Sequence, residues 1–137
     1  MKDDDVRELL RGAHTIAVVG LSADRGKASY GVARYMKERG YRIIPVNPGA
    51  QEILGEKVYP NLSAIPDPVD IVDIFRPPAA IPPIVEEAIR VGAKAVWMQE
   101  GIAHAEAARQ AEAAGLAVVQ DRCIMKEHFR LLGAGLR

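Results

Sequence analysis

The stretch from Thr15 to Tyr35, TIAVVGLSADRGKASYGVARY, constrains the fold more than any other part of the chain. It opens with an apolar, mostly β-branched run over residues 16–19 that stops at Gly20. Small and polar residues follow, and then a helical pattern places Val32 and Tyr35 on one side. A strand, a glycine-containing turn and a helix form the unit with which α/β domains bind phosphate, because backbone N–H groups at the helix start face the anion. This stretch therefore predicts a nucleotide-type binding domain.

The remaining chain repeats this alternation of strand and helix. The strands are short apolar runs without an in/out pattern, which indicates a parallel sheet buried on both faces. Right-handed crossovers then predict one Rossmann-like, doubly wound α/β domain over residues 1–137, with five strands in the order 3-2-1-4-5. Residues 1–13 are expected to add a helix that packs on this domain. The predicted strands are 15–19, 41–46, 70–75, 94–98 and 116–119, and the predicted helices are 3–11, 29–39, 81–91, 104–114 and 124–132.

Composition excludes several classes of function. The net charge is zero, so the basic excess that nucleic-acid binding usually requires is absent. No apolar run approaches the ~18 residues that a membrane span needs, and the N-terminus, MKDDDVRELL, is unlike a signal peptide. The single cysteine, Cys123, rules out an internal disulfide framework and suits a reducing compartment. We therefore predict a cytoplasmic protein that binds neither nucleic acid nor membranes.

The candidate site follows from the predicted topology. In an open α/β sheet, ligands lie across the carboxyl ends of the strands where the strand order reverses. Arg25 and Lys27 follow the first strand and could bind phosphate, or they could be solvated loop charges. The segments expected at this edge are Gly20-Leu21-Ser22, Asn47-Pro48, Phe75-Arg76-Pro77, Gln99-Glu100-Gly101 and Asp121-Arg122-Cys123.

Binding of NAD is disfavoured by two departures from the dinucleotide fingerprint. The turn contains Gly20, Gly26 and Gly31, which is not the G-x-G-x-x-G spacing. The second strand ends at Asn47 without the carboxylate that normally contacts the ribose hydroxyls. NADP is less clearly excluded, because Arg25 and Lys27 are close by in sequence.

Four separated motifs resemble a known family. They are VVGLSADRGKASYGVARYMKERGYRIIPVNP, VDIVDIFRPP, AVWMQEGI and VVQDRCIMKEH. In this order and spacing they resemble the stand-alone coenzyme A-binding domain family, whose fold is similar to the N-terminal domain of the succinyl-CoA synthetase α subunit and of ADP-forming acyl-CoA synthetases. The resemblance covers residues 16–128. This chain has Ile124-Met125 where family members commonly carry proline.

The resemblance implies that coenzyme A (CoA) or an acyl-CoA is the ligand and assigns roles to the candidate residues. Gly20, Leu21, Ser22, Ser29 and Tyr30 would hold phosphate groups. Asn47 and Pro48 would border the adenosine, and Phe75, Arg76 and Pro77 with Gln99, Glu100 and Gly101 would line the pantetheine path. The chain contains no residue that matches the phosphorylated histidine of the full synthetases, so the resemblance implies binding without the ligase reaction.

Several alternatives stay open at this stage. Arg76 could contact the ligand or form a structural salt bridge, and Glu100 could cap the following helix or orient the ligand. Trp97 and Cys123 are both expected in the core. A thioester-handling activity of Cys123, an NADP-linked oxidoreductase, and a CoA-sensing subunit that acts with a separate catalytic chain are the competing functions. A homodimer is plausible, because edge strands need cover. No metal site is predicted, since the histidines are scattered.

Overall fold

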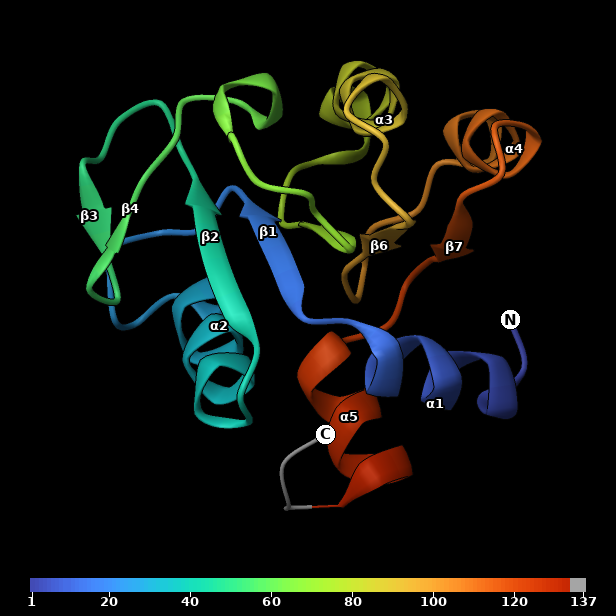
Figure 1. The fold of residues 1–137 in the computed structure, drawn as a ribbon, viewed down its shortest axis with the longest axis horizontal. Helices are drawn as coiled ribbons and strands as arrows, with labels where there is room; N and C mark the ends of the chain where they lie inside the picture. The colour runs from blue at the N-terminus through green and yellow to red at the C-terminus, as the bar shows by residue number, and fades with distance from the viewer. Residues whose placement is uncertain (134–137) are drawn as a thin grey trace.

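Five parallel strands form one sheet that lies between two layers of helices (Figure 1). The computed structural model describes residues 1–133. The strand positions agree with those predicted from the apolar runs, and all four pairings in the sheet are parallel. The strands are β1 (Thr15–Val19), β2 (Arg42–Val46), β5 (Ile71–Ile74), β6 (Ala95–Met98) and β7 (Ala117–Val119).

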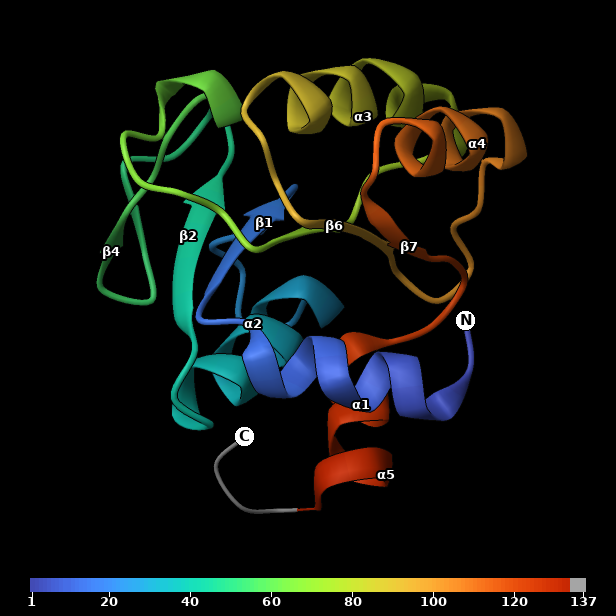
Figure 2. The ribbon, with the colours of Figure 1, turned by 45° about the vertical axis from the view of Figure 1, so that its right-hand side comes forward.

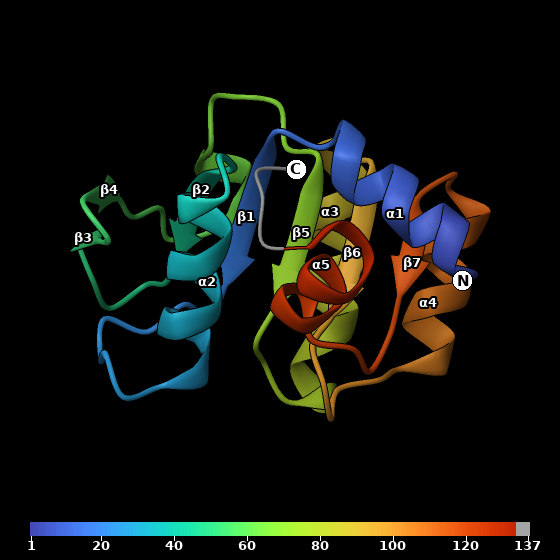
Figure 3. The same ribbon diagram turned by 90° about the horizontal axis from the view of Figure 1, so that it is seen from below.

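The helices divide between the two faces of the sheet, as a doubly wound fold requires. One face is covered by α1 (Asp3–Gly12), α2 (Ala28–Glu38) and α5 (Ile124–Leu132), as seen from below in Figure 3. The opposite face is covered by α3 (Ile81–Arg90) and α4 (Ala105–Ala113), which lie side by side (Figure 2). The predicted single α/β domain is thus confirmed. None of the described helices is long and apolar enough to cross a membrane.

The predicted strand order is wrong. The sheet runs β2-β1-β5-β6-β7, which is 2-1-3-4-5 when its five strands are counted along the chain. The place outside β2, where the third strand was expected, is partly taken by the extended backbone at Tyr59. The N–H of Tyr59 donates to the carbonyl of Pro45 at 3.0 Å, and the N–H of Asn47 donates to the carbonyl of Tyr59 at 3.0 Å. Because proline within a strand is confined to sheet edges, Pro45 is the residue from which this order could have been predicted.

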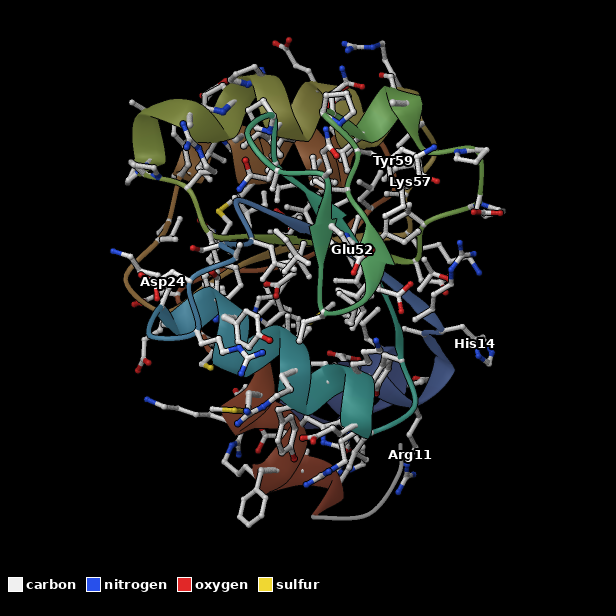
Figure 4. The ribbon with its side chains drawn as sticks, turned by 90° about the vertical axis from the view of Figure 1, so that its left-hand side faces the viewer. Arg11, His14, Asp24, Glu52, Lys57 and Tyr59 are labelled. Carbon is white, nitrogen blue, oxygen red and sulfur yellow. The ribbon has the colours of Figure 1, made fainter. Side chains whose placement is uncertain are left out.

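The connection from β2 to β5 contains a small hairpin that the sequence did not indicate. It consists of β3 (Glu52–Ile53) and β4 (Glu56–Lys57), followed by the 3-10 helix η1 (Leu62–Ala64). A second 3-10 helix, η2 (Pro78–Ala80), precedes α3. Figure 4 shows the hairpin toward the viewer, where the Lys57 ammonium lies 5.1 Å from the centre of the Tyr59 ring. The hairpin therefore lies beside β2, outside the main sheet.

Two apolar clusters, one on each face of the sheet, form the core. The cluster beneath α3 and α4 is wholly aliphatic apart from Met98 and includes Val72, Ile74 and Ala111. The cluster beneath α1, α2 and α5 contains Trp97 and Cys123, both of which the sequence placed in the core. The four buried polar or charged residues of the described chain are Ser29, Asp73, Gln99 and His128.

Candidate functional site

The predicted loops meet at the carboxyl edge of the sheet. Figure 4 shows the two ends of the molecule, with Asp24 in the loop after β1 at one end and His14, which precedes β1, at the other. Because all five strands are parallel, the loops after β1, β2, β5 and β6 lie at the end marked by Asp24. The strand order reverses between β1 and β5, so this edge contains the topological switch point at which ligands bind in such sheets.

Gly20 allows the loops after β1 and β5 to approach each other closely. Its φ angle is +87°, which favours glycine, and a Cβ atom added to it would lie 2.6 Å from the carbonyl oxygen of Phe75. The same Cβ would lie 3.1 Å from Cδ of Arg76. A larger residue at this position would therefore separate the two loops that form the switch point.

The loop from Leu21 to Ser29 is held by its own side chains. The N–H of Ser22 donates to Oγ of buried Ser29 at 3.0 Å, and Oγ of Ser22 accepts from the N–H of Asp24 at 3.0 Å. Nδ2 of Asn47 donates to the carbonyl of Leu21 at 2.9 Å, while the Leu21 side chain lies in the core. The buried side chains of Ser29 and Leu21 thus shape the loop from within, and the ligand contacts expected of these two residues stay predictions.

One hollow, here called the α3-side hollow, lies between the ends of β1 and β2 and helix α3. Its volume is about 410 Å³. Five predicted site residues line it: Gly20, Ser22, Asn47, Pro48 and Arg76. Other lining residues, which the sequence did not identify, are Val19, Val46, Pro60, Asn61, Ala80, Pro83, Ile84 and Glu87. This mixture of apolar walls and amide groups has the character of a small-molecule pocket.

A second hollow, here called the α5-side hollow, lies on the opposite face between the starts of α2 and α5. Its volume is about 530 Å³. Three predicted site residues line it, Phe75, Gln99 and Glu100. The remaining lining residues are Ala28, Gly31, Val32, Arg34, Ile102, Cys123, Met125 and Lys126. The sequence prediction missed the contributions of α2 and α5, since these side chains reach the edge only through helix packing.

Polar contacts tie the loops around the α5-side hollow to α5. Oε1 of buried Gln99 accepts from the N–H of Ile124 at 3.1 Å, and Lys126 donates to Oε1 of Glu100 at 2.8 Å. The bond to Glu100 raises the pKa of Lys126. Of the two roles left open for Glu100, capping of the next helix is taken by another residue, because Nδ1 of His104 accepts from the N–H of Ala107 at the start of α4.

Three cationic side chains at the carboxyl edge are free to meet an anion. Arg25, Lys27 and Arg76 are all exposed, and none forms an ion pair with another residue of the range 1–133. The structural salt bridge considered for Arg76 is therefore not present among the described residues. Helix α2 begins beside this group, and no side chain caps its first N–H groups.

The other predicted residues contribute to the edge without lining either hollow. Tyr30 is half-buried on α2, against the core cluster of that face, and Pro77 is exposed at the start of η2. Gly101, with a φ angle of +85°, donates its N–H to Oδ1 of Asp121 at 2.6 Å. Their proposed ligand contacts stay predictions.

Two buried titratable groups lie on the α2 and α5 side of the sheet. Asp73 shares its strand face with Ile71 and is 1 % exposed, and its Oδ1 has no hydrogen-bond partner in residues 1–133. Burial raises the pKa of the Asp73 carboxyl well above its ordinary value. His128 is fully buried, with Nδ1 3.1 Å from the Tyr35 hydroxyl. Burial is the main cause that lowers the pKa of its imidazole, and the positive charge of the nearby Arg39 lowers this pKa further. Within the part of the chain that the structure describes, no three His, Cys, Asp or Glu side chains are grouped to hold a metal ion.

Comparison with known proteins agrees with this arrangement. A family model described as "CoA binding domain" matches residues 14–129. The uncharacterized protein YneT of Bacillus subtilis is 38 % identical over 124 residues, which are 90 % of this chain and 92 % of YneT. A solved structure from Pyrococcus horikoshii OT3 matches with a TM-score of 0.94 and 44 % identity, over 97 % of this chain and 94 % of that one. The ADP-forming acetate–CoA ligase II of Archaeoglobus fulgidus is 36 % identical over 92 residues, but these are 66 % of this chain and only 14 % of the ligase.

Proposed function

The chain belongs to the CoA-binding domain family, and from this premise we propose that it binds coenzyme A or an acyl-CoA across the carboxyl edge of its sheet. The observation that carries the proposal is the extent of the family match. Residues 14–129 include every loop of the edge on which the two hollows open. We further propose that the domain binds this ligand without catalysis of its own, in a reducing cytoplasm that suits a single buried cysteine.

The proposed orientation of CoA follows the chemistry of the edge. The adenosine occupies the α3-side hollow, whose walls include the amide of Asn47 and the ring of Pro48. The phosphate groups meet Arg76, Lys27 and the uncapped start of α2, where helix dipole and cations both favour negative charge. The pantetheine arm enters the α5-side hollow between Phe75 and Gln99.

The proposal is tested by measuring thermal shifts and then calorimetric affinities for CoA, dephospho-CoA, acetyl-CoA, NADP and ATP. A ligand that binds only the folded state raises the melting temperature. We expect CoA and acetyl-CoA to give the largest shifts, and dephospho-CoA a smaller one because it lacks the 3′-phosphate. A shift with NADP alone would contradict the proposal and favour the oxidoreductase.

A charge-matched pair of variants locates the phosphate contacts. The double variant Lys27→Ala/Arg76→Ala should weaken CoA binding by roughly tenfold or more, because each charge-assisted hydrogen bond contributes about 1.5–3 kcal/mol. The control Arg11→Ala/Arg90→Ala removes the same net charge from two exposed positions that line neither hollow, Arg11 lying at the end opposite Asp24 in Figure 4. Equal affinity of the two double variants would refute the assignment of Lys27 and Arg76.

A second candidate role is that of a binding subunit with a separate catalytic partner, because part of the ADP-forming acetate–CoA ligase II of Archaeoglobus fulgidus is similar to this chain. Affinity purification of the tagged chain from its own cells, with and without CoA, tests this point. Recovery, only in the presence of CoA, of a separate chain with the other domains of such ligases would support a binding subunit that acts in trans.

A further inference from the structure

The α5-side hollow adjoins a third hollow, which lies between α2 and α5 and is here called the α2–α5 groove. The groove is lined by Tyr35, Met125, Lys126 and Phe129, with a volume of about 350 Å³. Met125 and Lys126 also line the α5-side hollow, so the two hollows share a wall. A ligand in the α5-side hollow therefore lies next to the groove.

One side of α2 borders both hollows and carries small residues beside the first of them. Ala28 and Gly31 line the α5-side hollow and Tyr35 lines the groove, so one stripe of α2 with helical spacing borders both. A Cβ atom added to Gly31 would meet nothing within 4 Å, so its space is unfilled. Ala28 and Tyr35 lie about 10 Å apart along the helix axis at ~1.5 Å per residue, so this stripe borders the α5-side hollow at one end and the groove at the other.

The groove is apolar and exposed. Phe129 is 58 % exposed and is one of only three large hydrophobic residues with high exposure in the described chain, the others being Met1 and Val91. Met125 is adaptable in shape, and the aromatic faces of Tyr35 and Phe129 offer apolar area. The ammonium of Lys126 pairs with Glu100 at 2.8 Å, and both side chains are more than half exposed, so the ion pair can move at low energetic cost.

We propose that the ligand of this domain is a thioester of CoA with a medium-length apolar acyl group, and that the acyl chain lies in the α2–α5 groove. This inference rests on the proposed function, which assigns the α5-side hollow to the pantetheine arm. The thioester then lies beside Met125 and Lys126, and the acyl carbons extend between Tyr35 and Phe129. Burial of the acyl chain against these side chains adds to the affinity that the CoA moiety provides.

The test compares calorimetric affinities for CoA, acetyl-CoA and octanoyl-CoA, below the concentration at which octanoyl-CoA forms micelles. We expect octanoyl-CoA to bind about tenfold more tightly than CoA, because several methylene groups leave water. Phe129→Ser should remove most of this advantage and change the affinity for CoA less than about twofold. The control Val91→Ser changes another exposed apolar residue, at the end of α3, and should keep the advantage.

Three other results of these measurements would contradict the acyl-chain inference, and they differ in what they mean for the proposed function. Equal affinity for CoA and octanoyl-CoA would overturn the acyl-chain inference and leave the proposed function intact. Absence of binding by all three ligands would overturn both. If Phe129→Ser instead changes the oligomeric state in analytical ultracentrifugation and leaves the preference for octanoyl-CoA unchanged, the groove is an interface between copies of the chain, and the inference is wrong.

Discussion

The two faces of the sheet are packed with different kinds of side chain. The face beneath α3 and α4 is buried with aliphatic side chains and one methionine. The face beneath α1, α2 and α5 holds all four buried polar or charged residues of the described chain, Ser29, Asp73, Gln99 and His128. Hydrophobic burial is non-directional, whereas a buried polar group must be paired or neutral. A candidate ligand hollow opens on each face, but only on the α2 and α5 face do buried polar side chains hold the loops beside it, as Gln99 does through its bond to Ile124.

The largest expected effect comes from placing a carboxyl group on the aliphatic face. Val72 and Asp73 are neighbours on β5 and point to opposite faces. Val72→Asp should lower the free energy of unfolding by about 4 kcal/mol or more, because this face offers the carboxyl no polar partner. Urea denaturation gives the value, and Val72→Ala, expected to cost about 1–3 kcal/mol, separates the charge from the lost volume. If both variants are equally stable, the two faces do not differ in this way.

An intermediate effect is expected at Asp73. Its pKa in the folded protein is raised above the ordinary 3.8, so folding favours the protonated carboxyl. The corresponding stability is complete below pH 3.8 and is lost as the pH rises toward the folded pKa, by at most about 1.4 kcal/mol per pH unit. Asp73→Asn should therefore become more stable than the unchanged protein as the pH rises from about 4 to 7. Urea denaturation at several pH values measures this difference. A constant difference across that range would show that Asp73 is already ionised in the fold.

The smallest effect is expected at His128 and has the opposite sign. Its pKa in the folded protein lies below the ordinary 6.5, so folding favours the neutral imidazole. The corresponding stability is complete above pH 6.5 and is lost as the pH falls through the folded pKa, by at most about 1.4 kcal/mol per pH unit. His128→Gln should remove this acid-induced loss in urea denaturation. The exposed control His14→Gln should retain it. An unchanged pH profile for His128→Gln would mean that the imidazole is not buried in solution.

The elements of the fold were predictable because each carries a strong local pattern. The five strands are short apolar runs, and the helices have apolar residues with a period near 3.6 and glycine after their ends. The right-handed crossover rule alone does not predict the strand order, because it permits both orders, and the signal that separates them is Pro45, which is typical of an edge strand. The hairpin of β3 and β4 was missed because its turn has Leu54 at a φ angle of 56°, a position where turn patterns lead one to expect glycine or asparagine.

The candidate site was only partly predictable, because local patterns identify the ends of strands but not the packing of helices around them. The residues that end strands, such as Gly20 and Phe75, are recognisable because the topological rule identifies the edge in advance. The division of these residues between two hollows depends on how α2 and α5 pack, which local patterns do not encode. Met125 and Lys126 are the clearest examples of lining residues absent from the predicted site, since their positions on a helix do not by themselves show that they face a hollow.

The backbone at Tyr59 covers the edge of β2 and so hinders the addition of a further strand to the sheet at that edge. A free edge is a template on which another chain can add a strand and begin aggregation. At β2 the edge is paired through Tyr59, and Pro45 offers no N–H group, while the other edge strand, β7, is only three residues long. The ends of this sheet thus resist extension, and a homodimer of this chain is expected to join through helices and loops, without a continuous intermolecular sheet.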